Sequence, residues 1–163
     1  MKRVVLDTNV LVSAILIPES IPARLFDKML DPRSGITLVT SPPLLGELSK
    51  VLRMDKFARY FGDHAHEVDE FVGHLKRLAV CTEGELKVRC VEADPADDFV
   101  ISCALEGAAS VIVSGDRHLL SMKEYEGIHI VSPREAWDNL LDGAIIHQDD
   151  DIFSTGVEWE AEK

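Results

Sequence analysis

Cysteine is scarce in this sequence of 163 residues, and its three copies form no recognisable motif. Cys81, Cys90 and Cys103 are odd in number and include no Cys-x-x-Cys pair, which argues against a disulfide framework and against a zinc site. No stretch approaches the roughly 18 apolar residues that a membrane span requires. The N-terminal segment reaches a carboxylate at Asp7, too early for a signal peptide. We therefore expect a cytoplasmic protein with reduced thiols and no membrane partner.

Motifs of several common enzyme classes are also missing. The sequence contains no Gly-x-Gly-x-x-Gly and no Gly-Lys-Ser/Thr phosphate loop, the usual signs of dinucleotide and nucleoside triphosphate sites. It contains no Gly-x-Ser-x-Gly, so a serine nucleophile on a sharp strand-to-helix turn has no support. With 46% hydrophobic residues, the chain is long enough to bury a core without disulfides or metals. We expect one globular domain.

Positive charge is in deficit, because 17 Lys and Arg residues face 29 Asp and Glu residues, for a formal net charge of −12. This balance argues against a nucleic-acid partner, since phosphate contacts need Lys and Arg. Half of the excess lies in the segment 142–163, however, which has one Lys and these seven acids: Asp142, Asp149, Asp150, Asp151, Glu158, Glu160 and Glu162. We expect this segment to be an acidic, partly disordered tail. If a cation neutralises a carboxylate cluster in the rest of the chain, RNA binding becomes possible.

Strand and helix patterns alternate through residues 1–141. Short apolar runs bounded by turn residues predict strands, and apolar residues at helical spacing predict helices. Such alternation predicts an α/β domain with a parallel sheet covered by helices on both faces. The expected strands are 3–7, 36–40, 79–82, 110–113 and 128–131, and the expected helices are 9–16, 21–30, one opened by Ser41-Pro42-Pro43, 54–61, 64–78, 96–106 and 133–141.

Two aspartates stand where apolar strand patterns end. Asp7 follows residues 3–6, and Asp116 follows residues 110–113 after Ser114 and a glycine. In an open parallel sheet, ligands bind at the carboxyl ends of the strands, so side chains that are distant in sequence can meet there. The alternative is that Asp7 only caps an Asx turn that joins strand to helix, and that Asp116 only belongs to a turn from strand to loop. The spacing favours a shared site but leaves both interpretations open.

Two further acidic positions lie on expected helices. Glu47 lies about two turns into its helix, at the margin of the apolar stripe, where it can reach inward or stay solvated. Asp97 and Asp98 lie in the first turn of helix 96–106, just after Asp94. Acids there interact favourably with the helix dipole, but adjacent carboxylates repel one another. One or two acids would satisfy the helix dipole, so the presence of three suggests a further role for them.

Gathered carboxylates would repel one another unless a cation joined them. We therefore predict a metal site built from Asp7, Glu47, Asp98 and Asp116, with Asp97 in support. Polar neighbours of the strand-end acids could fix a water or a phosphate oxygen: Thr8, Asn9 and Ser114.

A basic stripe stands near Glu47. Lys50, Arg53, Lys56 and Arg59 recur every three residues along an expected helical stretch. A charged, solvated helix face is the default interpretation. The alternative, which we carry forward, makes Arg53, Lys56 and Arg59 contacts for an RNA backbone.

Taken together and in order, these segments resemble the PIN-domain ribonucleases, and the resemblance covers roughly residues 1–141. The Asp-Pro-x-Asp-Asp form and the stretch 53–60 are similar to those of toxin components of toxin–antitoxin pairs. The motifs that carry the resemblance are Asp7-Thr8-Asn9, Glu47 on the helix after the second strand, Asp94-Pro95-Ala96-Asp97-Asp98 and Val113-Ser114-Gly115-Asp116.

The resemblance implies a three-layer α/β/α sandwich around a parallel sheet of about five strands, and Mg²⁺- or Mn²⁺-dependent cleavage of single-stranded RNA. It also implies an antitoxin protein as partner and a homodimer. Carried over by position, the ligands of one or two ions are Asp7, Glu47, Asp98 and Asp116, with Asp97 as an outer ligand, while Thr8, Asn9 and Ser114 orient water and substrate. Two departures, Ala96 in place of a frequent acid and Ser102 in place of a small apolar residue, remove no ligand.

Two other functions remain open from the sequence. The first is a PIN-like binding or regulatory module with little turnover. The second is a metal-dependent phosphatase of the haloacid-dehalogenase kind, which also begins with an aspartate at a strand end. That class expects a second aspartate two residues later, where this chain has Asn9.

Overall fold

A sheet of six strands in the order β3-β2-β1-β4-β6-β5 forms the centre of the computed structural model, which describes residues 1–89 and 95–141. The pairings are parallel except that of β5 with β6, which is antiparallel. The strands are β1 (Lys2–Leu6), β2 (Ile36–Thr40), β3 (Val80–Cys81), β4 (Val111–Val113), β5 (Glu124–Tyr125) and β6 (Ile128–Val131). The central strands β1 and β4 are short and apolar because helices cover both of their faces.

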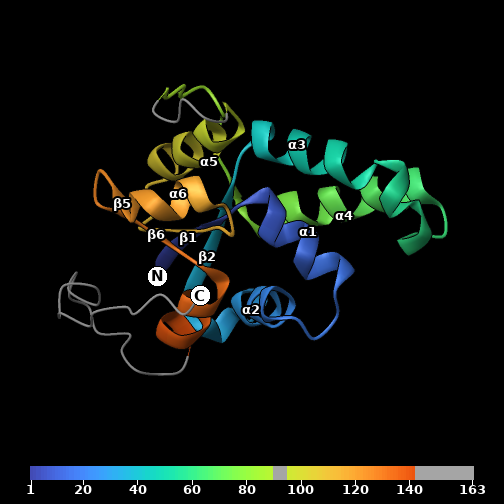
Figure 1. The fold of residues 1–163 in the computed structure, drawn as a ribbon, viewed down its shortest axis with the longest axis horizontal. Helices are drawn as coiled ribbons and strands as arrows, with labels where there is room; N and C mark the ends of the chain where they lie inside the picture. Colours follow the sequence, from blue (N-terminus) through green and yellow to red (C-terminus); the bar gives the residue numbers. More distant parts are fainter. Residues whose placement is uncertain (90–94, 142–163) are drawn as a thin grey trace.

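Helices lie on both faces of the sheet and make the domain an α/β/α sandwich (Figure 1). Successive side chains of a strand point to opposite faces, so Val4 and Leu6 of β1 enter one hydrophobic core and Val5 enters the other. The first core includes buried side chains of α1, α2, α3 and α4, and the second includes those of α5 and α6. The helices are α1 (Thr8–Leu16), α2 (Ile21–Leu30), α3 (Pro42–Leu52), α4 (His64–Leu78), α5 (Pro95–Glu106), α6 (Arg117–Met122) and α7 (Pro133–Ala136), the last followed by a π-helix, η3 (Trp137–Leu141).

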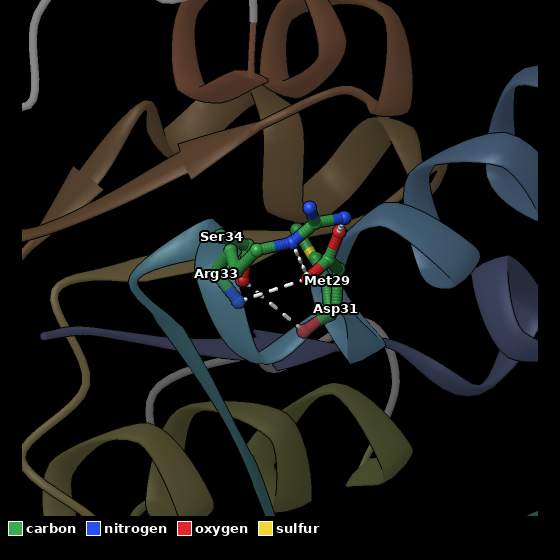
Figure 2. A network of polar contacts seen from close by, with 4 residues as sticks. All are labelled: Met29, Asp31, Arg33 and Ser34. Carbon is green, nitrogen blue, oxygen red and sulfur yellow. Dashed lines mark hydrogen bonds and ion pairs between the residues drawn. The ribbon is translucent and has the colours of Figure 1, made fainter.

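A short 3₁₀ turn, η1 (Pro32–Ser34), connects α2 with β2 (Figure 2). The Asp31 carboxylate caps it by accepting hydrogen bonds from the Arg33 backbone N–H at 2.9 Å and from the Arg33 guanidinium at 2.9 and 3.1 Å. These hydrogen bonds lower the pKa of Asp31 to about 2. Gly35 follows with a left-handed φ of 71°, a conformation that costs glycine little. The turn thus sets where β2 enters the sheet.

The helices α3 and α4 pack side by side and form an arm that extends from the sheet (Figure 1). Ser41 begins α3 because its hydroxyl accepts a hydrogen bond from the Leu44 backbone N–H at 3.4 Å, and prolines fill the first turn. A second 3₁₀ helix, η2 (Asp55–Tyr60), follows α3 at the outer end of the arm. Glu47 therefore lies along α3 between the sheet and η2.

The segment before α5 is tied to that helix by its own backbone. The Gly84 and Glu85 N–H groups donate to the Glu106 carboxylate at 2.9 and 3.1 Å, and the Val88 N–H donates to the Ser102 hydroxyl at 3.0 Å. The buried serine thus has a structural partner that a small apolar residue would lack. The helix α5 packs on β1, β2 and β4, and its first turn carries Asp97 and Asp98.

Two expectations from composition bear on the described residues. Cys81 and Cys103 are free thiols, and burial raises the pKa of the Cys103 thiol to about 12, which makes it a poor nucleophile. Within residues 1–89 and 95–141, no single helix is long and apolar enough to cross a membrane. The helices α1 and α2 together have the required length and composition, but the chain bends by 98° between them.

The structure confirms the predicted α/β/α sandwich and corrects several details. The sheet has six strands rather than about five, because the sequence analysis missed the two-residue β5. It also missed the short helix α6, and the expected helix 54–61 is the 3₁₀ helix η2. The capping box at Ser132 is present, but α7 gives way to a π-helix after Ala136. The expected acidic tail 142–163 lies outside the described residues, as does Asp94.

Candidate active site

The candidate site begins where two adjacent parallel strands end. Leu6 of β1 pairs with Val113 of β4, so the next residues, Asp7 and Ser114, lie side by side although 107 positions separate them. The Asp7 backbone N–H donates to the Val113 carbonyl at 2.9 Å and extends the ladder by one hydrogen bond. Parallel pairing thus brings the two strand-end motifs together.

The Asp7 carboxylate is the buried centre of the site, with the residue only 6% exposed. One of its oxygens accepts a hydrogen bond from the Ser114 hydroxyl at 2.5 Å, and the other accepts one from the Thr8 backbone N–H at 2.7 Å as the N-cap of α1. Burial raises the pKa of Asp7 to about 6, and the negative charges of Glu47 and Asp116 add to the rise, while the two hydrogen bonds oppose it. The carboxylate therefore stands where a positive charge would stabilise it.

Thr8 connects Asp7 to the helical arm. Its backbone N–H binds Asp7, and its buried hydroxyl donates to a carboxylate oxygen of Glu47 at 2.9 Å. Glu47 is half-buried on α3, which packs against α1. The glutamate thus faces inward, one side chain away from Asp7.

Asp116 caps α6 at the other side of Ser114. Its carboxylate accepts hydrogen bonds from the backbone N–H groups of His118 and Leu119 at 2.7 and 3.3 Å. Its own backbone N–H donates to the Ser114 hydroxyl at 3.0 Å. Asn9 steadies the same loop, because its side-chain oxygen accepts a hydrogen bond from the Gly115 N–H at 3.3 Å.

The two acids of α5 differ in burial. Asp97 is 5% exposed, whereas Asp98 is half-exposed in the same first turn. The sequence analysis assigned the inner position to Asp98 and the outer one to Asp97. That assignment stays a prediction, and the greater burial belongs to Asp97.

The three candidate RNA-contacting cations lie away from this cluster, at the end of α3 and in η2. Arg53 forms an ion pair with Asp69 of α4. Lys56 and Arg59 are exposed and lie beside the aromatic rings of Phe57 and Tyr60. Arg53 thus pairs with a carboxylate, whereas Lys56 and Arg59 lie against aromatic rings.

The polar residues beside the acids make contacts within the protein that the sequence did not reveal. Ser114 donates to Asp7, Thr8 donates to Glu47, and Asn9 accepts from Gly115. All three side chains were predicted to orient water or substrate, and that role stays a prediction. The cap of α6 was missed, although Asp116 followed three residues later by the apolar pair at 119–120 was a usable signal for a helix start.

The donors around Asp7 suit a hard divalent cation, because they are carboxylate and hydroxyl oxygens without a thiolate or imidazole. In the part of the chain that the structure describes, no three His, Cys, Asp or Glu side chains stand in an arrangement that could hold a metal ion. Donor chemistry and charge thus fit Mg²⁺ or Mn²⁺, whereas the described side chains do not converge on a common point in the positions that they occupy here.

The mostly parallel sheet, its two helical layers and the acidic side chains of Asp7, Glu47 and Asp116 define an α/β/α protein with an acidic candidate site at the ends of its strands. The chain belongs to the PIN domain family, whose model matches residues 3–118. It is 28% identical over 122 residues to an uncharacterized protein of Methanocaldococcus jannaschii, MJ1680, in an alignment that covers 75% of this chain and 76% of the relative. Its fold is similar to that of a chain in the crystal structure of VapBC2 from Rickettsia felis bound to a DNA fragment from its promoter, with a TM-score of 0.54 and 12% identity over 80% of this chain and 98% of that one.

Proposed function

We propose that this protein is a metal-dependent endoribonuclease that hydrolyses phosphodiester bonds in single-stranded RNA. The observation that carries the proposal is the buried Asp7 carboxylate, whose pKa is raised to about 6 at the carboxyl edge of a PIN-domain sheet with Glu47 and Asp116 nearby. Buried carboxylates with a raised pKa and like-charged neighbours are typical of functional sites. Asp7 also caps α1, but capping alone requires neither burial nor two acidic neighbours.

The carboxylates of this cluster would hold one or two Mg²⁺ or Mn²⁺ ions. We assign Asp7, Glu47, Asp98 and Asp116 as ligands and Asp97 as an outer ligand. The bound ion would supply positive charge for the attacked phosphate and would lower the pKa of a water molecule.

The side chains around the ligands have positioning roles in this proposal. The Ser114 hydroxyl fixes one oxygen of Asp7, and the Thr8 hydroxyl turns Glu47 towards the same place. Asn9 holds the loop that carries Asp116. A substrate phosphate or a water could take the remaining hydrogen-bonding capacity of these three polar groups.

We also propose that the protein is the toxin of a toxin–antitoxin pair. The fold likeness to a chain of the VapBC2 complex supports this, since that complex was solved on promoter DNA. On this basis a small antitoxin protein would bind the chain, which could form a homodimer and would act in the cytoplasm.

The test is cleavage of a labelled single-stranded RNA in Mn²⁺ and in EDTA. We expect the wild type to cleave only with Mn²⁺, and Asp7→Asn to lose at least about 100-fold in rate, because loss of a supporting residue alone commonly costs 10- to 100-fold. Asp27→Asn on the exposed face of α2 is the matched control and should keep full activity. Equal activity of Asp7→Asn and the wild type would exclude the proposed site.

A binding module with little turnover is the second candidate function. One observation favours it: the oxygens of Asp7 and one of Asp116 are already occupied by hydrogen-bond donors of the protein itself. In that case the wild type and Asp7→Asn would both leave the RNA intact in Mn²⁺, and RNA binding would persist in EDTA.

A further inference from the structure

The outer end of the arm carries a second surface, formed by basic and aromatic side chains of η2. A 3₁₀ helix has three residues per turn, so residues i and i+3 lie one above the other. Lys56 and Arg59 therefore form one row, and Phe57 and Tyr60 form the adjacent row. We call these four residues the η2 surface.

Contacts between cations and aromatic rings join the two rows. The Lys56 ammonium lies 4.9 Å from the centroid of the Phe57 ring, and the Arg59 guanidinium carbon lies 4.9 Å from that of Tyr60. Arg59 also donates a hydrogen bond to the Tyr60 hydroxyl at 3.0 Å, and the two rings lie 6.5 Å apart. Tyr60 remains 45% exposed and is therefore accessible to a ligand. Cations and rings are thus held together in one place.

The charge of this segment opposes that of the whole chain. Residues 50–60 contain four basic residues and one acid, in a protein of net charge −12. Arg53 is neutralised by its ion pair with Asp69. Among residues 1–89 and 95–141, neither Lys56 nor Arg59 forms an ion pair with a carboxylate. Their charge is available to an anionic partner.

We propose that the η2 surface binds single-stranded RNA outside the cleavage site. Lys56 and Arg59 contact successive phosphates, and Tyr60, with the guanidinium lying over it, provides a plane on which an unpaired base stacks. Aromatic rings beside a basic row are the usual means of holding a single strand, whereas the bases of a duplex are stacked on one another and cannot reach them. The inference deepens the proposed function, on which it rests, because it gives the same substrate a second point of attachment.

The geometry of the arm fits such a strand. Glu47 lies five residues before the end of α3, about 7.5 Å along the helix axis at a rise of about 1.5 Å per residue, and η2 follows that end after Arg53 and Met54. RNA that reaches both sites would run along α3, so the η2 surface would favour longer strands over very short ones.

The test is binding of a fluorescent single-stranded RNA by anisotropy in EDTA, where metal-dependent cleavage is absent. We expect Tyr60→Ala to weaken binding by about 5- to 100-fold, the range that removal of one stacking ring causes, and Tyr60→Phe to keep most of the affinity. Lys56→Ala/Arg59→Ala should reduce the slope of log Kd against log salt by about 1.4, because each phosphate contact on a single strand contributes about 0.7. Tyr60→Ala should leave the slope unchanged.

The matched control is Lys76→Ala/Arg77→Ala in the last turn of α4, which removes the same charge from an exposed position outside η2. This double variant should change neither the affinity for RNA nor the slope of log Kd against log salt. Equal RNA affinity of all variants, or no RNA binding by the wild type, would overturn the inference and would leave a protein partner as the occupant of this surface. The outcome is separate from that of the proposed function, because cleavage depends on Asp7 and binding in EDTA does not require cleavage.

Discussion

The ends of β1 and β4 share one sequence plan but differ in their surroundings. Asp7 and Asp116 each follow a buried parallel strand and each caps a helix. Asp7 is 6% exposed, and burial raises its pKa to about 6, whereas Asp116 is half-exposed and is bound by two backbone N–H groups of α6. Packing around the strand end, rather than the sequence motif, therefore decides which carboxylate is costly to ionise. A bound cation would stabilise that carboxylate most.

Removal of the buried charge should have the largest effect on stability. In EDTA at pH 7, Asp7→Asn should raise the free energy of unfolding by up to about 3 kcal/mol, the cost of ionising a carboxyl whose pKa rises from 3.8 to about 6 on folding. Between these two values the folded state binds more protons than the unfolded state, so stability falls as the pH rises from about 4 to about 6. Urea denaturation should therefore show the gain at pH 7 and little of it at pH 4.

The control for this change is Asp27→Asn, which should alter stability little at either pH because Asp27 is exposed on α2. A gain in Asp7→Asn that is equal at pH 4 and pH 7 would contradict the assignment of the cost to the buried charge. A loss of stability at pH 7 would show that the hydrogen bonds of Asp7 outweigh its burial.

Loss of the hydroxyl beside Asp7 should have the next largest effect. Ser114→Ala removes a hydrogen bond of 2.5 Å to a buried carboxylate, which should lower the free energy of unfolding by about 2 kcal/mol at pH 7. The loss should be smaller at pH 4, where Asp7 is protonated. Ser121→Ala, which removes an exposed hydroxyl bonded to the His118 carbonyl at 2.7 Å, is the matched control and should cost less. Equal losses of unfolding free energy in Ser114→Ala and Ser121→Ala would contradict a special contribution of the hydrogen bond to the buried Asp7 carboxylate.

The smallest effect should come from the exposed strand end. Asp116→Ala should cost about 1 kcal/mol, the usual cost of losing an N-cap, and Asp116→Asn only a few tenths, because Asn caps helices as well as Asp does. Thermal denaturation in EDTA would measure both. A stabilising Asp116→Asn, of the size expected for Asp7→Asn, would show that the two carboxylates are equivalent after all.

Most of the fold was predictable because its signals are local. The apolar runs, the proline and serine caps and the helical stripes predicted β2, α2 and α4 at their observed bounds. The short elements α6 and β5 were missed, because two to six residues leave too little periodicity to recognise. The stretch 54–61 was predicted as a helix, and the sequence could not distinguish a 3₁₀ helix from an α-helix.

The candidate site was only partly predictable. The strand-end motifs predicted that Asp7 and Asp116 would share a site, and the parallel pairing of β1 with β4 places Asp7 beside Ser114, two residues before Asp116. The sequence could not show that the hydroxyl of Ser114 would bind Asp7 rather than point to solvent, because that depends on the separation of two strands. Nor could it show that Asp97 would be the more buried acid of α5, which depends on how the helix rotates on the sheet.

The central claim is that the carboxylates around Asp7 bind a divalent cation. Isothermal titration of the metal-free protein with Mn²⁺ tests it most directly, because it requires neither a substrate nor a partner. We predict one or two binding events in the wild type and in Asp27→Asn, and loss of binding in Asp7→Asn and Asp98→Asn. Absence of Mn²⁺ binding by the wild type, or unchanged binding by Asp7→Asn, would contradict it.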